Sequence, residues 1–581
     1  MSNHARESTF LSTTETVTYD PSDDLQRPPS VSDAHDNTRK MTDPPTSMPG
    51  YGNRSLPIRK EATINPLNIP PIIPPEHSRR TLVLCFDGTG DEFDNDNSNI
   101  VQFVSLLKKD DRSKQMVYYQ TGIGTYTTPN IVTPLMSKIS KVLDQAVALH
   151  LDKHVMDGYE FLMQNYMAGD RICIFGFSRG AYTARSLAGM LHKVGLLPAD
   201  NWQQVPFAYK MYTRTDKVGW EQSNAFKKAF SIDVSIEFLG VWDTVDSVGL
   251  VPRRLPFTTS NTIVHNFRHA VSLDERRAKF KANLWNRPNE EEAKLGIHSG
   301  DAKQTATETP RSSMSSTKKS SKRKETGHSQ EDPSFHWLDE DEAALDCRER
   351  QWSARRESIK STDVEEVWFA GCHSDVGGGS VKNSTRHSLA RIPLRWMIRE
   401  CFKTNSGIMF DSRRLWDVGL DPSTLYPYVT PRPARLPGGG LRLQTVPMET
   451  KRPWIKRLFS KPPPCPARQD ATSALIDAKS GRRITEEEEE LRDATAPMYD
   501  QLKLKPIWWL LELLPMEFRY QRGDAKWVSW FGMNLARPRF IPKQKTRGFK
   551  VHRSVQSRME ASPNERYIPS ALFLVNPTWV D

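Results

Sequence analysis

Residues 171–191 read RICIFGFSRGAYTARSLAGML and predict a strand, a sharp turn and a helix in immediate succession. The apolar run at 171–175 suits a strand that is buried on both faces of a sheet. Gly176-Phe177-Ser178-Arg179-Gly180 follows it and matches the G-x-S-x-G pattern of a nucleophile elbow, in which the turn lifts the serine hydroxyl above the sheet. Glycine on each side of the serine relieves the crowding of such a turn. The stretch therefore predicts an α/β fold with a reactive serine, Ser178, at a strand end.

Three further apolar runs have the same character and stop at a polar or glycine-containing segment. They are residues 81–86, 235–242 and 364–370. Helical patterns lie between the runs, over residues 99–107 and 141–166. Alternating strands and helices predict a mostly parallel sheet flanked by helices on both faces. The functional site of such a sheet lies beyond the carboxyl ends of its strands.

Two of these strand ends carry the residue types that an activated serine requires. A serine nucleophile needs a base, and the base needs a carboxylate to orient it, in the chain order serine, acid, histidine. Asp243 directly follows the run at 235–242, and His373 follows the run at 364–370. Asp246 and Asp375 are rival acids, and Asp243 is preferred because it is nearest to its strand. The predicted triad is therefore Ser178, Asp243 and His373.

An oxyanion formed at Ser178 requires two hydrogen-bond donors. The first is expected to be the backbone N–H of Arg179, the residue after the nucleophile, and the second an N–H from an early strand–helix loop. Gly88 and Thr89, just past the first strand, are the natural source of that second donor. This chemistry requires no cofactor and no metal.

Five segments of the chain occur in a fixed order: FDGT at 86–89, GFSRGA at 176–181, VWDTV at 241–245, HAVSLDERR at 269–277 and HSDVGGG at 373–379. Together they resemble the α/β-hydrolase family that contains the type VI secretion phospholipase effectors, over about residues 79–400. The resemblance implies a serine lipase or phospholipase with Ser178 as nucleophile, Asp243 as acid and His373 as base. Lipid as the substrate is implied by the resemblance alone.

Changes in composition predict the domain organisation. Residues 1–77 are rich in Ser, Thr, Pro and Asp and are expected to form a disordered tail. The hydrolase domain is expected over 78–420, with a low-complexity, disordered insertion at about 290–362. Residues 421–495 are expected to form a linker with a second low-complexity segment, and 496–581 a C-terminal accessory region that packs on the hydrolase domain.

Composition excludes several classes of protein. The 581 residues include 81 Lys and Arg against 70 Asp and Glu, a net charge of +11, and 37% hydrophobic residues. No stretch reaches the roughly 18–20 uncharged apolar residues of a spanning helix, and the N-terminus carries no secretory signal. Six cysteines make no disulfide framework. An integral membrane protein, a disulfide scaffold and a fibrous protein are excluded, and the missing signals predict a cytoplasmic protein.

Three local patterns suggest other chemistry but lack a necessary residue. Asp87 follows a strand as in haloacid-dehalogenase phosphatases, but Cys85 stands where their nucleophilic aspartate would lie. An EF-hand that begins at Asp94 fails at its glycine and glutamate positions, although a different metal site near Asp87 stays open. His150 and His154 are four residues apart on a helix but have no third ligand nearby in sequence.

Two segments suggest contact with other molecules. Residues 318–324 contain a Lys/Arg run that suits a solvated loop better than a nuclear signal, and no aromatic interleaving indicates nucleic acid. Trp508 and Trp509 lie in an apolar segment, 507–516, that suits either a buried helix or peripheral contact with a lipid surface. Three functions remain: a lipase or phospholipase, a soluble esterase with a non-lipid substrate, and a non-catalytic scaffold on a hydrolase fold.

Overall fold

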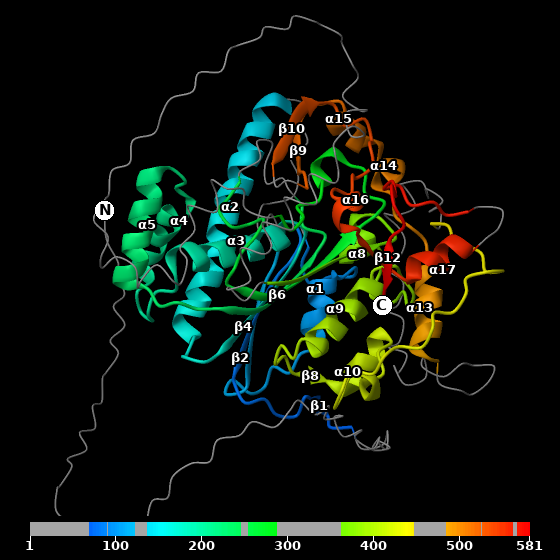
Figure 1. The fold of residues 1–581 in the computed structure, drawn as a ribbon, viewed down its shortest axis with the longest axis horizontal. Helices are drawn as coiled ribbons and strands as arrows, with labels where there is room; N and C mark the ends of the chain where they lie inside the picture. The colour runs from blue at the N-terminus through cyan, green and yellow to red at the C-terminus, as the bar shows by residue number, and fades with distance from the viewer. Residues whose placement is uncertain are drawn as a thin grey trace, which may run out of the picture. The chain divides into compact units, whose positions relative to one another are not determined.

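The apolar runs of the sequence form the centre of one parallel sheet. The computed structural model describes residues 69–89, 91–122, 136–245, 254–286, 362–446, 484–523, 526–561 and 566–581. Eight strands lie in the order β12-β11-β7-β6-β5-β4-β2-β3, and every neighbouring pair is parallel. Their bounds are β2 (Thr81–Phe86), β3 (Gln115–Gln120), β4 (Arg171–Phe177), β5 (Ile236–Trp242), β6 (Val264–Ser272), β7 (Asp363–Phe369), β11 (Lys550–His552) and β12 (Thr578–Val580). The predicted α/β-hydrolase architecture, a parallel sheet flanked by helices, is confirmed (Figure 1).

Helices cover both faces of this sheet, which explains why its central strands are apolar throughout. One face is covered by α2 (Met136–Asn165), α3 (Ser178–Val194), α4 (Val205–Thr213) and α5 (Lys217–Phe230), and the other by α1 (Asn99–Leu106) and α9 (Arg391–Lys403). Along β2, Leu82 and Leu84 enter the first core, whereas Val83 and Cys85 enter the second. Side chains on both faces of β2 are therefore buried, as expected for a central parallel strand.

Shorter elements connect the layers. The remaining helices are α8 (His373–Gly377), α10 (Ser412–Leu415), α13 (Glu486–Ala494), α14 (Gln501–Leu504), α15 (Trp509–Glu512), α16 (Gln544–Arg547) and α17 (Ser554–Glu560). Single 3-10 turns are η2 (Trp202–Gln204), η3 (Ala278–Phe280), η5 (Trp416–Val418), η6 (Pro422–Thr424) and η7 (Pro506–Trp508). Two antiparallel pairs stand apart from the main sheet: β1 (Ile72–Ile73) with β8 (Phe410–Asp411), and β9 (Met516–Gln521) with β10 (Trp527–Gly532). No helix in the described ranges is both long and apolar enough to cross a membrane.

The boundary predicted for the N-terminal tail, residue 77, is too late. Ile73 is fully buried, and β1 pairs with β8 through Ile72 opposite Asp411 and Ile73 opposite Phe410. The proline-rich stretch that suggested a linker thus contributes a short strand to the folded unit, since proline is tolerated at the edge of a sheet. Residues 1–68, the remainder of the predicted tail, lie outside the described residues.

The C-terminal region, 496–581, was expected to be an accessory segment that packs on the hydrolase domain, and it extends the main sheet. β11 pairs with β7, and β12 pairs with β11. Val551 of β11 and Val555 of α17 share a core cluster with Val271 and Trp368 of the central strands. The C-terminal region is therefore part of the hydrolase core.

The predicted linker, 421–495, contains an ordered acidic helix. Helix α13 begins with a capping box in which Thr485 and Glu488 each accept a hydrogen bond from the other's backbone N–H. Asp493 is fully buried and pairs with Arg395 at 2.7 Å. Glutamates of the acidic run 486–490 pair with arginines as well. Residues 447–483, and residues 290–361 of the insertion predicted at about 290–362, lie outside the described residues.

Candidate active site

Three strand ends bring the predicted triad together at one edge of the sheet. Ser178 follows β4 and begins α3, Asp243 follows β5, and His373 begins α8 a few residues after β7. Because all three strands run parallel, their carboxyl ends meet at the same edge. All three side chains are buried.

The turn at Ser178 has the geometry of a nucleophile elbow. Ser178 has a φ of +58°, a conformation that is uncommon for a residue with a side chain and that marks a strained turn. A Cβ at Gly176 would lie 2.5 Å from the carbonyl oxygen of Gly180. A Cβ at Gly180 would lie 2.3 Å from the carbonyl oxygens of Phe86 and Asp87. Both glycines are thus required by close backbone approach, which explains their spacing around the serine.

A continuous chain of hydrogen bonds joins the three side chains. His373 Nε2 lies 2.8 Å from Ser178 Oγ, and His373 Nδ1 lies 2.5 Å from Asp243 Oδ2. A carboxylate can only accept, so Nδ1 donates to Asp243 and Nε2 is left to accept the proton of the serine hydroxyl. This is the tautomer that a general base next to a serine requires.

Burial favours the neutral form of the imidazole. Burial lowers the pKa of His373 below its ordinary value, against the opposing effect of Asp243. Burial alone would raise the pKa of Asp243, but the positive charge of Arg539 and the hydrogen bond from His373 together hold it well below its usual range. At neutral pH the site therefore holds a neutral base beside an ionised acid.

Arg539 is the main site residue that the sequence reasoning missed. Its guanidinium donates to both carboxylate oxygens of Asp243, with Nη2 at 2.8 Å from Oδ2, and it is almost fully buried. The backbone N–H of Ser272 donates a further bond to Asp243 Oδ1 at 2.9 Å. No pattern in the sequence marks Arg539, because it lies in a polar segment 296 residues from Asp243.

The segment 269–277, noted in the sequence only through its resemblance to a family motif, supports the histidine loop. Glu275 Oε2 accepts from the backbone N–H of His373 at 3.2 Å and pairs with Arg277 at 2.8 Å. Asp274 Oδ2 accepts from the N–H of Gly371 and from the hydroxyl of Tyr567, at 2.8 and 2.6 Å. Both carboxylates thus fix the backbone that carries the imidazole.

Asp375, the rival acid within the described residues, has a different role. Its Oδ2 accepts from the backbone N–H groups of Cys372 and Tyr499, each at 2.9 Å. Burial raises its pKa to about 7, and backbone hydrogen bonds offset only part of that effect. Asp375 therefore caps α8 and holds the segment before α14, whereas Asp246, the second rival, lies outside the described residues.

Gly88 and Thr89, the two predicted sources of the second oxyanion donor, differ in their hydrogen bonds. The Gly88 N–H donates to Asp87 Oδ1 at 2.8 Å and is thus already committed. The hydroxyl Oγ1 of Thr89 is buried without a hydrogen-bond partner among the described residues. Arg179 is the second residue of α3, so its N–H belongs to the first turn, where backbone donors have no partner within the helix.

Asp87 fixes this loop through three hydrogen bonds that its carboxylate oxygens accept. Its Oδ1 also accepts from Ser98 Oγ at 2.6 Å, and its Oδ2 accepts from the hydroxyl of Tyr119 at 2.8 Å. His387, Glu489 and Asp493 form the one group in the described residues with ligand atoms close enough for a metal. Both carboxylates of that group pair with Arg391, and Asp493 also pairs with Arg395, so the cluster is an ion-pair network.

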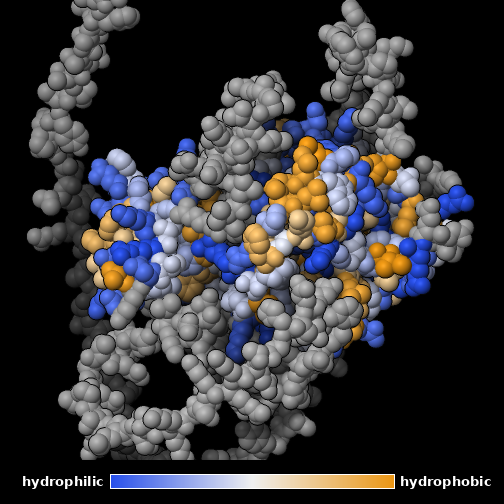
Figure 2. Space-filling model, turned by 90° about the horizontal axis from the view of Figure 1, so that it is seen from above, coloured by the Kyte–Doolittle hydropathy of each residue, from blue (hydrophilic) through white to orange (hydrophobic). Residues whose placement is uncertain are grey.

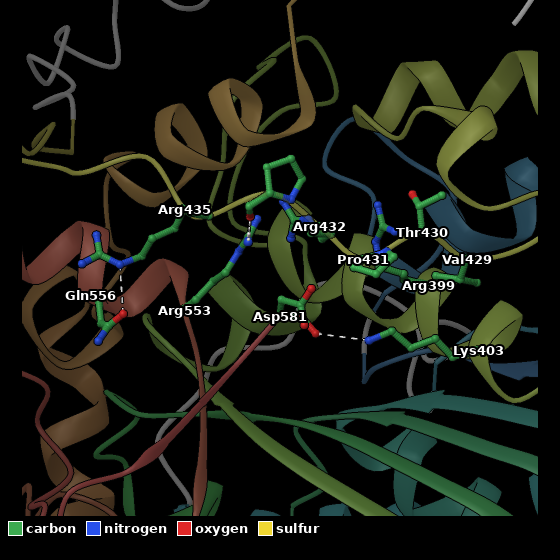
Figure 3. Close-up of a pocket in the computed structure, with 12 residues that line it drawn as sticks. Arg399, Lys403, Val429, Thr430, Pro431, Arg432, Arg435, Arg553, Gln556 and Asp581 are labelled. Carbon is green, nitrogen blue, oxygen red and sulfur yellow. Dashed lines mark hydrogen bonds between the residues drawn. The ribbon is translucent and has the colours of Figure 1, made fainter. Parts of the chain in front are cut away.

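A pocket of about 580 Å³ beside α13 has a structural explanation as well (Figure 3). Four of the residues that line it are Arg399, Arg432, Arg435 and Arg553. Each of them pairs with a glutamate of α13 or α17. No triad residue lines this pocket, and its cations are balanced by carboxylates, so it marks the ion pairs that fasten the segment around Arg432.

Aromatic rings cover the imidazole and connect it to an exposed apolar segment. The rings of Phe177 and Phe280 each lie 4.8 Å from that of His373. Trp508 packs edge-on against Phe280 at 5.6 Å, and Arg277 lies over the rings of both. Of the two tryptophans singled out in the sequence, Trp508 is thus half-buried above the site, and Trp509 is exposed.

The fold and the strand-end geometry define a protein with the architecture of the α/β hydrolases. Residues 80–400 match the family model described as "T6SS, Phospholipase effector Tle1-like, catalytic domain". The match spans more than half of the chain, and the protein belongs to this family. Membership supports a lipase or phospholipase activity in general terms.

The proteins similar to this chain include a curated relative and two solved structures. The uncharacterized protein YEL023C of Saccharomyces cerevisiae is 30% identical over 591 aligned residues, which cover 86% of this chain and 81% of the yeast protein. An uncharacterized protein from Pseudomonas aeruginosa is 18% identical, with a TM-score of 0.28, over 57% of this chain and 46% of that one. The Tle1 effector bound to the VgrG spike is 16% identical, with a TM-score of 0.25, over 53% of this chain and 52% of that one. This chain thus spans about half the length of each solved structure.

Proposed function

We propose that the protein is a serine hydrolase that cleaves carboxylic esters of acyl lipids. The observation that carries this proposal is the buried hydrogen-bond chain Ser178–His373–Asp243 at the carboxyl edge of the sheet. Family membership supports the same class of reaction.

The reaction follows from the roles of the three side chains. Ser178 Oγ attacks the ester carbonyl while its proton moves to His373 Nε2, and Asp243 stabilises the imidazolium that results. The carbonyl oxygen becomes an oxyanion that accepts hydrogen bonds from the backbone N–H groups of Arg179 and Thr89. The C–O bond to the leaving alcohol breaks as His373 returns the proton. Water then attacks the acyl-enzyme while its proton moves to His373 Nε2. His373 returns that proton to Ser178 Oγ as the bond to the acyl group breaks, and the free acid leaves.

An exposed apolar surface beside the site favours a lipid substrate. The large apolar side chains that are at least two-fifths exposed there come from η7, α15, β10 and the turns that follow α15 and β10: Ile507, Trp509, Leu510, Leu513, Leu514, Phe531, Met533 and Leu535. Figure 2 views the molecule from the side on which α15 and β10 lie in Figure 1, and apolar side chains gather on that face. Contiguous apolar surface of this kind suits contact with a lipid interface. Because Trp508 packs on Phe280, this contact would lie next to the imidazole.

The decisive experiment compares phospholipid vesicles with a short-chain, water-soluble ester as substrates of the full chain. We expect faster hydrolysis and vesicle binding for the lipid, and loss of both in Trp509→Ala/Leu510→Ala, with hydrolysis of the soluble ester unchanged. Phe207→Ala, an exposed apolar residue on α4, is the matched control and should leave both activities unchanged. Turnover of the soluble ester alone would indicate a soluble esterase, and no turnover of either substrate would indicate a scaffold.

A further inference from the structure

The catalytic acid is held by a cation that comes from the far C-terminal region. The five N–H groups of a guanidinium have a fixed fork geometry, and in Arg539 each nitrogen has a partner in the site. Nη1 donates to Asp243 Oδ1 and to the carbonyl of Ser272, whereas Nη2 donates to Asp243 Oδ2 and to the carbonyl of Phe280. Nε donates to the Phe280 carbonyl at 3.0 Å.

The carboxylate of Asp243 is equally saturated. Oδ1 accepts from Ser272 N–H and from Arg539, and Oδ2 accepts from Arg539 and His373. A carboxylate offers about four acceptor positions, so all are in use. A bidentate guanidinium also fixes the plane of the carboxylate, which a single hydrogen bond would leave free to rotate.

Glu512 holds both segments between which Arg539 lies. This buried carboxylate of α15 accepts from the backbone N–H of Ala278, two residues before Phe280. It also accepts from the Asn534 side chain and from the N–H of Ala536 at 2.8 Å, in the turn that leads to Arg539. Glu512 therefore fixes the two segments that flank the guanidinium, and through α15 it connects them to the apolar surface.

We propose that Arg539 positions the catalytic acid. It locks the Asp243 carboxylate in the orientation that accepts from His373 Nδ1 and so keeps His373 Nε2 facing the serine. The proposal rests on the function proposed above, because it assigns a role within the same reaction. Arg539 does not contact the substrate or the serine, and it acts through Asp243.

Two physical effects of Arg539 can be separated by experiment. Loss of the fork frees the carboxylate and misplaces the imidazole, which should slow acylation of Ser178 by about tenfold to a hundredfold. Loss of the positive charge next to Oδ2 favours the protonated imidazole, which should raise the pH at which activity falls on the acid side. A residue with a merely structural role would not move that pH.

The test measures the rate of covalent labelling by a fluorophosphonate probe, and the pH profile of hydrolysis of a soluble ester, in the full chain. Arg539→Gln should show both effects. Arg539→Lys keeps the charge but not the fork and should be slower than wild type with the acid side of its profile unmoved. The control is Arg537→Gln, which removes the same charge from an exposed side chain of the same segment and should behave as wild type.

A double variant and a folding check complete the test. In Asp243→Asn, the further change Arg539→Gln should cost nothing, since Arg539 acts through that carboxylate. Wild-type labelling and an unmoved profile in Arg539→Gln would overturn the proposal. If Arg539→Gln does not fold, as judged by thermal melting, a wild-type rate in Arg539→Lys would overturn it instead. Absence of labelling in the wild type would contradict the proposed function, and is thus distinguishable from failure of the Arg539 role.

Discussion

At the scale of single residues, the site depends on burial opposed by specific charges. His373 is almost fully buried, and desolvation lowers the pKa of its ring although Asp243 raises it. Asp243 stays ionised under complete burial because two cationic or proton-donating partners share its oxygens. The neutral base and the charged acid thus result from one arrangement of neighbours.

The lowered pKa of His373 predicts the pH dependence of ester hydrolysis. The active form of His373 is the neutral ring, which is lost as pH falls through its pKa. Because this pKa lies below the ordinary 6.5, kcat/KM for a soluble ester should stay level at neutral pH and fall only below about pH 6.5. A pH–rate profile of the wild-type chain provides the check, and a fall that begins well above pH 7 would contradict the assigned environment.

A second prediction concerns the glycine after the nucleophile. In Gly180→Ala the new methyl group would lie 2.3 Å from two carbonyl oxygens at the end of β2, so α3 must move away from the sheet. We expect a loss of about 1–3 kcal/mol in the free energy of unfolding and loss of serine reactivity. Chemical denaturation measures the first and probe labelling the second. Gly439→Ala, where no atom lies within 4 Å, is the control, and equal behaviour of the two variants would refute the argument.

At the scale of elements, some features were predictable from the sequence and others were not. The strands β2, β4, β5 and β7 were predicted within a residue or two because each is a continuous apolar run. β11 and β12 have three residues each, too few to show any period, and their pairing partners lie far away in sequence. The acidic run of α13 was interpreted as low complexity because its arginine partners cannot be recognised without the fold.

The ion pairs of α13 predict a large contribution to stability. In Asp493→Ala the guanidinium of Arg395 loses a buried partner at 2.7 Å, which should cost about 3–5 kcal/mol of unfolding free energy. Glu488→Ala removes an exposed capping contact and should cost about 1 kcal/mol. Urea denaturation of both variants makes the comparison, and similar losses would mean that the buried pair is not important for stability.

The pH dependence of this effect follows from the same residue. Burial would raise the pKa of Asp493, but its arginine neighbours and His387 lower it to about 2, against 3.8 in the unfolded chain. A group with a depressed folded pKa stabilises above its unfolded value and ceases to do so as pH falls through the folded one. The stability difference between wild type and Asp493→Ala should therefore be constant above about pH 4 and shrink toward pH 2.

At the scale of the whole molecule, the candidate active site and the C-terminal region form one unit. β11 and β12 complete the sheet edge next to β7, and the same region supplies Arg539 to the triad. The sequence sufficed to single out the three residues that the hydrogen-bond chain joins, because each directly follows a strand or begins the helix after it. It did not reveal Arg539 or Glu512, whose partners lie 296 and 234 residues away.

Truncated chains test whether the candidate active site needs the C-terminal region. A chain limited to residues 78–420, the hydrolase domain predicted from composition, lacks β11, β12 and Arg539 and should fail to fold or to react with the probe. A chain of residues 64–581 keeps every described element, from β1 (Ile72–Ile73) onward, and should melt and react as the full chain does. Circular dichroism and probe labelling report both results. A folded, reactive 78–420 fragment would contradict the role assigned to the C-terminal region.

The most direct test of the central claim, an activated serine in a triad, is mass spectrometry of the fluorophosphonate adduct. The full chain should carry one adduct, on the peptide that contains Ser178. Ser178→Ala should carry none, and His373→Ala should react at least about a thousandfold more slowly while melting as wild type does. A folded wild-type chain without an adduct, or an adduct that persists in Ser178→Ala, would contradict the claim.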